Sequence, residues 1–311
     1  MSRYAIMPQA LWELRSRYTD AYQVLFDEAG FVTMPATTLA DIPPDATTVL
    51  LFVGAHGRKL LGEVPSLKAD LSVVLYLGGA HAFANDRARC LPALNRANVI
   101  LSGCDQLFRR TWPEHAKRFV FFPNFFAPHE RFTKLAARRR TMRRCLLSGH
   151  SSSYTYPLRA IIWQAINNGS GLHNKVHVMQ HPRWWQNRRD LQSWEISPRL
   201  GDDYGRTLGA YYCALTTASR YKYALMKYFE VPAAGALLLA NDAPDVRLTG
   251  LKAGRHFVPI NKYNALKTIK YVLEHRDEYE EIRKDGAAFV RHHHSVRNRA
   301  AQLEKLLEAA Q

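Results

Sequence analysis

The chain has 311 residues, of which 47% are hydrophobic and 23% are charged, a balance that excludes collagen, coiled coil or disorder as the main architecture. Lysine and arginine together number 43 against 27 aspartates and glutamates, so the formal net charge is +16. This surplus indicates anionic partners, whether phosphates, nucleic acid or an acidic membrane surface.

The first part of the chain alternates short β-rich runs with helical patterns. Strands are expected at residues 4–7, 31–34, 47–53, 71–77, 98–102 and 119–122. Helices are expected among them at residues 11–29, 58–69, 86–97 and 105–117. Strands that alternate with helices predict parallel βαβ units in a doubly wound sheet.

A basic segment then interrupts the pattern. Residues 131–144 hold seven basic residues and no acidic one, and we interpret them as a linker between domains at residues 1–130 and 145–311. The arginine run at residues 138–144, and the RWWQNRR patch at residues 183–189, leave three interpretations open. They fit contact with nucleic acid, contact with an anionic membrane, or a solvated face.

The second part alternates in the same way. Strands are expected at residues 145–148, 176–180, 211–217, 236–240 and 257–260. Helices are expected at residues 156–168, 200–210 and 221–229, and from residue 264 to the end with a break near Gly286. Two α/β domains of similar kind are therefore predicted.

Location is suggested only by what the sequence lacks. No apolar run reaches the length of a membrane span, and the first residues do not resemble a signal peptide, so a cytoplasmic protein is expected. The four cysteines form no CxxC pair, which fits a reducing compartment and predicts no zinc site.

The first candidate site follows the strand expected at residues 71–77. Gly78 and Gly79 would let a ligand approach the backbone, and His81 has a pKa suited to a general base. Asp86 is a rival base, and a similar Gly-Ala-His-Gly stands at residues 54–57. The alternative for each histidine is a loop residue that hydrogen-bonds to the backbone.

A second candidate is the turn that contains Gly149 and His150. It follows the strand at residues 145–148 and precedes a helix that opens at Pro157, so its backbone N–H groups are expected to form an anion site. The alternative is an ordinary polar loop between a strand and a helix.

The most informative stretch is RYKYALMKYFEVPAAGALLLA, residues 220–240. A helix that carries Lys222, Lys227 and Glu230 runs into Gly235, whose freedom at positive φ allows a sharp turn into a buried strand. Such a charged cluster at the edge of a parallel sheet is where doubly wound folds bind ligands. The alternative is a surface helix with a Lys227–Glu230 ion pair.

The segment KYFEVPAAGALLL resembles the K-x-F-E-x-x-A-x-G-x-L-L signature of GT-B glycosyltransferases of the CgeB-like, "glycosyl transferases group 1" kind. The resemblance is clear from residue 220 to about residue 306, and weaker over residues 98–132 and 146–159. It implies two Rossmann-like domains that face each other across a cleft, with the acceptor in the first and a nucleotide-diphosphate sugar in the second. In relatives the last helix crosses back to the first domain, and the resemblance allows the same here.

The resemblance also implies roles for individual residues. Glu230 would contact the donor ribose, and cations at Lys227, Arg220 and Arg159 would meet the diphosphate. The other predicted donor-binding residues are Lys222, Gly235, Gly149 and His150. No metal ion or cofactor is expected, because basic side chains and helix N-termini would stabilise the leaving diphosphate.

Retaining relatives carry a pair of glutamates, but the position eight before Glu230 is Lys222. An inverting transfer is therefore expected, with His81 or Asp86 of the first domain as base. The predicted activity is transfer of a sugar to an acceptor hydroxyl of a glycan or lipid-linked glycan, with an anionic membrane as a further partner. The alternative is a nucleic-acid-binding protein, or a DNA-modifying glycosyltransferase, on the same fold.

Overall fold

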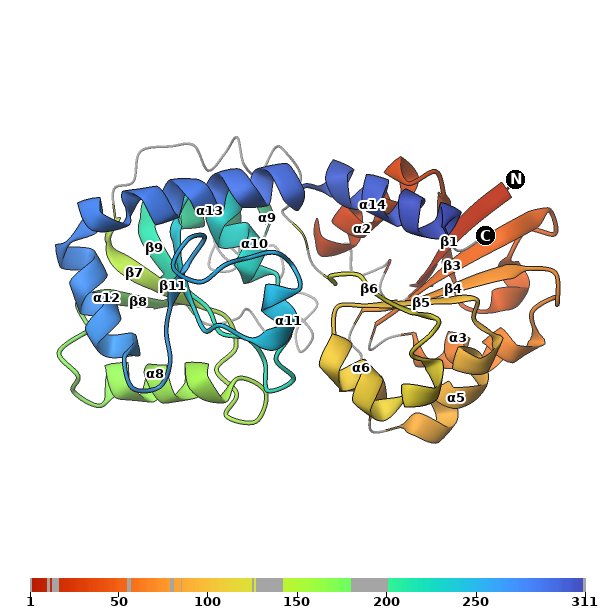
Figure 1. Cartoon of the computed structure of the whole chain (residues 1–311), viewed down its shortest axis with the longest axis horizontal. Helices are drawn as coiled ribbons and strands as arrows, with labels where there is room; N and C mark the ends of the chain where they lie inside the picture. Colours follow the sequence, from red (N-terminus) through yellow and green to blue (C-terminus); the bar gives the residue numbers. More distant parts are fainter. Residues whose placement is uncertain are drawn as a thin grey trace. The chain divides into compact units, whose positions relative to one another are not determined.

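The computed structural model describes residues 2–9, 12, 17–54, 57–78, 81–84, 86–124, 126, 142–179 and 201–309. The chain divides into two compact units, each built on one parallel sheet (Figure 1). Unit 1 comprises Met1–Asn124 together with Val296–Gln311, and unit 2 comprises Phe125–Ser295. Most of the predicted linker, residues 131–141, lies outside the described residues.

Unit 1 contains a six-stranded sheet in the order β2-β1-β3-β4-β5-β6, with every pair parallel. Its strands are β1 (Ser2–Pro8), β2 (Val32–Ala36), β3 (Ala46–Val53), β4 (Ser72–Leu77), β5 (Val99–Ser102) and β6 (Phe119–Phe121). Its helices are α2 (Arg17–Glu28), α3 (Arg58–Glu63), α4 (His81–Ala84), α5 (Arg87–Arg96), α6 (Asp105–Thr111) and α14 (Val296–Glu308), with 3₁₀ turns η1 (Leu39–Asp41), η2 (Val64–Ser66) and η3 (Pro113–His115).

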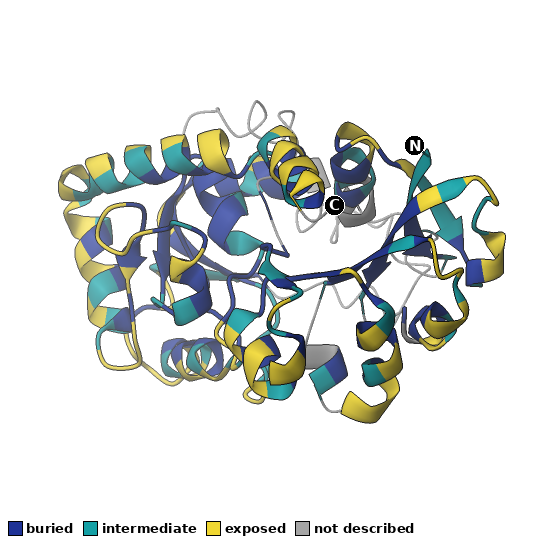
Figure 2. Cartoon of the chain, turned by 45° about the vertical axis from the view of Figure 1, so that its right-hand side comes forward, coloured by how far each residue is buried: buried dark blue, intermediate teal, exposed yellow. Residues whose placement is uncertain are grey.

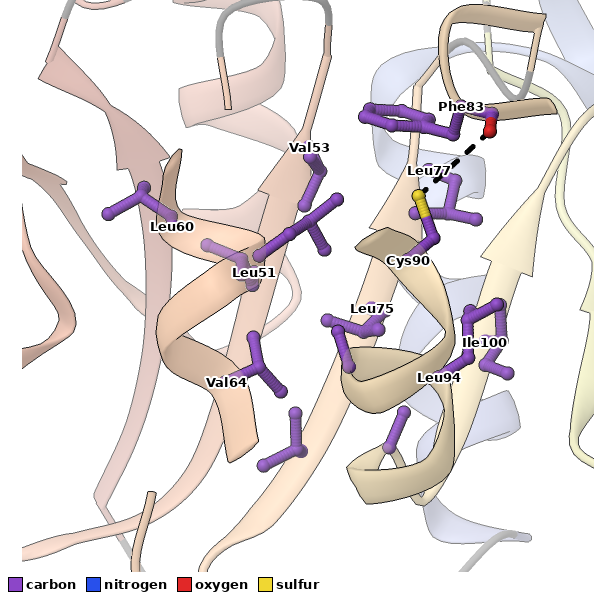
Figure 3. Packing of buried hydrophobic residues seen from close by; sticks show 14 of the residues in the cluster. Leu51, Val53, Leu60, Val64, Leu75, Leu77, Phe83, Cys90, Leu94 and Ile100 are labelled. Atoms are coloured by element: carbon purple, nitrogen blue, oxygen red, sulfur yellow. Dashed lines mark hydrogen bonds between the residues drawn. The ribbon is translucent and has the colours of Figure 1, made fainter. Parts of the chain in front are cut away.

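The central strands β3, β4 and β5 are mostly apolar on both faces because helices cover the sheet on both sides. Figure 3 shows Leu51 and Leu75 of the sheet packed with Val64 of η2 and Leu94 of α5. In Figure 2 the strands are mainly buried, while exposed residues follow the outer helix faces. The helix expected at residues 58–69 ends early, because Pro65 lacks an N–H and its ring hinders a continuing α-helix.

Unit 2 contains a five-stranded parallel sheet in the order β11-β10-β9-β7-β8. Its strands are β7 (Met142–Ser148), β8 (Val176–Met179), β9 (Tyr211–Leu215), β10 (Leu237–Ala240) and β11 (Val258–Pro259). Its helices are α8 (Pro157–Asn167), α9 (Gly201–Ala210), α10 (Lys227–Ala233), α11 (Pro244–Arg247), α12 (Ala265–Glu274) and α13 (Glu280–His293), with the 3₁₀ turn η6 (Arg276–Tyr279).

The order of strands in unit 2 fixes where a ligand is expected. Within the sheet, β7 lies between β9 and β8. The chain leaves β7 toward β8, at one edge of the sheet, and leaves β9 toward β10, in the direction of the other edge. Doubly wound sheets bind ligands at this switch point, outside the carboxyl ends of the strands. The loops that follow Ser148 and Leu215 meet there.

Two helical predictions in unit 2 are wrong. The helix expected at residues 221–229 begins only at Lys227, because Lys222 has a φ of 64° and interrupts any helix there. The break expected near Gly286 is absent, since α13 runs through it and the helices end at Glu274 and His293 instead. A Cβ at Gly286 would lie 2.3 Å from the carbonyl oxygen of His256, so the glycine permits close packing.

The last helix, α14, packs against α2 and therefore belongs to unit 1, whereas the predicted second domain extended to residue 311. Buried apolar side chains on one face of α14, such as Leu303 and Leu307, account for this association. Arg299 is also buried, with its guanidinium 5.8 Å from the centre of the Phe122 ring.

Among the described residues, no helix has the length and apolar composition needed to cross a membrane.

Candidate active site

Gly149 directly follows β7 at the switch point, and two cations lie close to it. Its φ of 107° is one that residues with a side chain rarely adopt. A Cβ here would lie 2.9 Å from Nη1 of Arg159 and 3.5 Å from Nζ of Lys227. Its own N–H donates to the carbonyl of Met179 at 3.1 Å, so this amide does not serve the anion nest expected from the sequence.

Arg159 of α8 joins the two loops of the switch point. It is 3% exposed, and its Nη1 donates to the carbonyl of His150 at 3.0 Å. Its Nη2 donates to Thr216 Oγ1 at 3.0 Å and to the carbonyl of Thr217 at 3.2 Å, beyond the end of β9. The Arg159 Nε–H and the Thr217 hydroxyl are buried without a hydrogen-bond partner within the described residues. Most of the guanidinium therefore organises the loops, although the prediction assigned it to the diphosphate.

Lys227 and Glu230 lie one turn apart at the start of α10, and both are half-buried. Burial lowers the pKa of Lys227 and the neighbouring Arg159 lowers it further, while Glu230 acts in the opposite direction. Burial raises the pKa of Glu230, and Lys227 opposes that rise. The three side chains form a partly desolvated group with two positive charges and one negative, which favours an anionic ligand.

Tyr204 of α9 completes this group. Its hydroxyl forms a 2.6 Å hydrogen bond with the Ser148 hydroxyl at the end of β7. The Lys227 ammonium lies 5.3 Å from the centre of its ring, within the range of a cation–π interaction. Neither Tyr204 nor Thr216 was predicted as a site residue.

Arg220 and Lys222 lie on the same loop but are exposed. The Arg220 guanidinium is 4.2 Å from the ring centre of Tyr154, a side chain that is 63% exposed. The backbone N–H of Arg220 donates to the carbonyl of Thr155 at 2.9 Å, which joins this loop to the one before α8. Both cations are at the predicted carboxyl edge, farther into solvent than Lys227.

The structure places Gly235, a predicted donor-binding residue, away from Lys227. It has a φ of 77° and turns the chain from α10 into β10, as expected. That turn leads to the amino end of β10, whereas Lys227 is at the other end of α10, beside the carboxyl ends of the strands. The Gly235 carbonyl accepts a 2.8 Å hydrogen bond from Arg283, so its role is in the turn.

The predicted bases lie in unit 1, after β4. His81 is the first residue of α4, and Asp86 precedes α5 with its carboxylate 3.4 Å from Nε of Arg89. Gly78 is closely packed, because a Cβ there would lie 2.9 Å from the Phe52 ring, and its predicted role in ligand approach stays a prediction. His56 and Gly79 lie outside the described residues.

Two surface hollows lie at the opposite edge of the unit 2 sheet from Lys227. They share Arg143, near the start of β7, and have volumes of about 360 and 550 Å³. Their position at the amino ends of the strands does not fit a ligand site of a doubly wound sheet. Among the described residues, no three His, Cys, Asp or Glu side chains gather where they could hold a metal ion.

Comparisons with known proteins extend this account. Residues 159–305, from Arg159 into α14, match the family model described as glycosyl transferase-like. No curated protein matches the chain significantly. The resemblance noted in the sequence is thereby confirmed at the level of glycosyltransferases, while the CgeB-like subtype stays a prediction.

Solved structures share the architecture. HepE of Anabaena, in complex with UDP and glucose, is 12% identical, with 99% of this chain and 100% of that chain covered and a TM-score of 0.62. An alpha-glucosyltransferase, in complex with UDP and a 13-mer DNA containing an A:G mismatch, is 9% identical, with 100% of both chains covered and a TM-score of 0.64. The N-terminal domain of Candida albicans trehalose-6-phosphate phosphatase is 11% identical, with 87% and 71% covered and a TM-score of 0.60.

At such low identities these likenesses show a common fold, that of two Rossmann-like units. The family match covers the part of the chain that holds Arg159, Lys227 and Glu230. Residues 159–305 are thus glycosyl transferase-like in sequence, and the protein is a glycosyltransferase with the GT-B fold.

Proposed function

We propose that this protein transfers a sugar from UDP to a hydroxyl of a glycan or lipid-linked glycan, with the donor bound at the switch point of unit 2. The observation that carries the proposal is the approach of Arg159 and Lys227 to Gly149, where a Cβ would lie 2.9 Å and 3.5 Å from their side-chain nitrogens. A partly buried cation against glycine backbone, at the carboxyl edge of a parallel sheet, suits a diphosphate. The choice of uridine is supported by HepE and the alpha-glucosyltransferase, whose structures contain UDP.

In the proposed reaction the acceptor oxygen bonds to the anomeric carbon while the bond from that carbon to the diphosphate oxygen breaks. UDP leaves with the electron pair, and the Lys227 ammonium stabilises its developing negative charge. A preorganised cation in a site of low polarity contributes strongly to such a step. We assign this stabilisation to Lys227 and not to a metal ion, so the proposed transfer is metal-independent.

Glu230 is proposed to accept hydrogen bonds from the ribose hydroxyls. It lies one helical turn after Lys227, which would place the ribose beside the diphosphate. The raised pKa of its carboxyl reflects burial, and Lys227 counteracts this rise. Binding of an anion at Lys227 would weaken that support, so hydrogen bonds from the ribose would become the main partners of the carboxylate.

We assign removal of the proton from the acceptor hydroxyl to His81, with Asp86 as the alternative base. Both follow β4 of unit 1, and the absence of a glutamate at Lys222 supports an inverting transfer. An inverting reaction needs a base on the acceptor and no protein nucleophile on the donor.

A nucleic-acid acceptor is the second candidate. It is favoured by the net charge of +16 and by the alpha-glucosyltransferase structure, which contains DNA. Filter binding to duplex DNA over a salt series tests it, because each phosphate contact steepens the salt dependence. Tight binding with a steep salt slope would favour DNA, and weak binding at all salt concentrations would favour a glycan.

Calorimetric titration with UDP-, GDP-, CMP- and TDP-sugars tests the main proposal. We expect UDP-sugars to bind most tightly, and Glu230→Ala to weaken that binding by about 1.5–3 kcal/mol, the range for hydrogen bonds to a charged group. Glu281→Ala, an exposed glutamate of α13, is the matched control. Equal binding of all four sugars, or an unchanged dissociation constant in Glu230→Ala, would contradict the proposal.

A further inference from the structure

One side chain of α9 contacts both halves of the site, although it was not predicted as functional. Tyr204 is 5% exposed, and its two contacts use different parts of the side chain. The hydroxyl bonds to Ser148 at the end of β7, at 2.6 Å. The ring lies 5.3 Å from the Lys227 ammonium at the start of α10. Tyr204 thus links the strand that presents Gly149 to the helix that presents the cation.

The surroundings of Lys227 explain why such a contact matters. Arg159 on α8 repels the ammonium, Glu230 on α10 attracts it, and His150 follows Gly149 on the facing loop. Burial and Arg159 both lower the pKa of Lys227. The face of an aromatic ring carries partial negative charge and so favours the charged form of a nearby amine.

The hydroxyl of Tyr204 has a separate task. Burial raises its pKa, and the negative charge of Glu230 raises it further, so the hydroxyl stays protonated at neutral pH. It can therefore bond to Ser148 in either direction. Because Gly149 is the next residue, this bond restrains the backbone that lies against Lys227.

We propose that Tyr204 is a positioning residue of the diphosphate site, in which its ring keeps Lys227 charged and in place and its hydroxyl holds the end of β7. This inference rests on the proposed function, in which Lys227 meets the diphosphate. A structural role in the core would require only the volume of the side chain. The proposal instead requires the ring face and the hydroxyl, each for a different contact.

Three substitutions separate these contacts. Tyr204→Phe keeps the ring and removes the hydroxyl, Tyr204→Met removes both at similar volume, and Ser148→Ala removes only the hydrogen bond. The first readout is the pKa of Lys227 in the nucleotide-free protein. It is measured by NMR on protein whose lysines carry ¹³C at the ε-carbon, and the Lys227 signal is assigned by its loss in Lys227→Arg. The second readout is the dissociation constant of UDP at neutral pH.

We expect Tyr204→Phe and Ser148→Ala to leave the pKa of Lys227 unchanged and to weaken UDP binding by a similar factor. We expect Tyr204→Met to lower that pKa by about one unit, given the strength of a desolvated cation–π contact. If Tyr204→Met does not fold, pentafluorophenylalanine at position 204 replaces it, because fluorination inverts the ring charge at nearly constant shape and should lower the same pKa.

An unchanged pKa of Lys227 in Tyr204→Met, or in the pentafluorophenylalanine variant that replaces it, would overturn the proposal, because only a volume effect would remain. Unequal effects of Tyr204→Phe and Ser148→Ala on UDP affinity would overturn the role of the hydroxyl. If Lys227→Met does not weaken UDP binding, the proposed function fails and this inference fails with it. The NMR readout shows which failed, since it needs no nucleotide.

Discussion

At the scale of single residues, the site depends on Gly149, because the lack of a side chain there leaves room for the side chains of Arg159 and Lys227. Gly149 combines a left-handed φ with the near contacts of Arg159 and Lys227. A glycine that merely turns the chain would show only the first property. Gly169, just after α8, does so: its φ is 89°, and a Cβ there would meet no atom within 4 Å.

Substitution at these two glycines separates backbone strain from crowding. We expect Gly149→Ala and Gly169→Ala each to destabilise the fold by about 1 kcal/mol or more, since both force alanine into a left-handed conformation. Only Gly149→Ala should also reduce UDP affinity, because its Cβ would lie 2.9 Å from Arg159 Nη1 and displace that guanidinium, and would occupy space next to Lys227. Thermal unfolding and calorimetry measure the two effects, and equal UDP affinities in the two variants would contradict the site.

Much of the site could be predicted from local sequence, and the remainder could not. Lys227 and Glu230 stand one turn apart in a recognisable pattern, and Gly149 ends an apolar strand. Tyr204 shows no such signal, because its partner Ser148 is 56 positions away and a tyrosine in a helix is common in cores. Arg159 was predicted as a ligand for phosphate, but its burial and its bonds to loop carbonyls appear only in three dimensions.

At the scale of elements, the alternation of apolar runs predicted the positions of the strands along the chain but not all helix limits. Strands buried on both faces are nearly continuous apolar runs, so β3, β4 and β10 are evident in sequence. Helix limits depend on single backbone conformations and on distant contacts. Because Lys222 has a left-handed backbone conformation, α10 begins only after it. Gly286, where a break in the helix was predicted, is instead explained by the close approach of the His256 carbonyl.

Gly286 provides the test at this scale. A Cβ there would overlap the His256 carbonyl, so we expect Gly286→Ala to destabilise the protein by about 1–3 kcal/mol, the usual cost of overpacking. The control is Gly62→Ala in α3, where a Cβ meets nothing within 4 Å. That substitution should be neutral or stabilising by up to about 1 kcal/mol, because alanine favours helices. Urea unfolding compares them, and a stabilised Gly286→Ala variant would contradict the packing.

At the scale of the whole molecule, the chain ends in the unit where it began. The last helix, α14, packs on α2 of unit 1, although the family match runs into it from unit 2. The sequence shows an amphipathic helix at this place but not the unit that receives its apolar face. Only the resemblance allowed for a last helix that returns to the first unit. The predicted domain limits placed this helix in the second domain.

The association of α14 is tested at Leu303, which is fully buried. Leu303→Ala should destabilise the protein by about 2–5 kcal/mol, as for other leucines removed from a core. Hydrogen exchange should show the loss in α2 and α14, while the exchange rates of α8 and α10 in unit 2 stay as in the unaltered protein. Glu304→Ala, the exposed neighbour, is the control. Faster exchange in unit 2 alone would contradict the assignment of α14 to unit 1.

The central claim is that Lys227 stabilises the diphosphate as it leaves, and turnover of UDP-sugars by Lys227→Met tests it most directly. UDP release with an acceptor glycan should fall by roughly a hundredfold or more, the loss seen when a preorganised electrostatic group is removed. The control Lys267→Met, an exposed lysine of α12, should retain full turnover, and both variants should keep the melting temperature of the unaltered protein to within a few degrees. Turnover in Lys227→Met equal to that of the control would contradict the account.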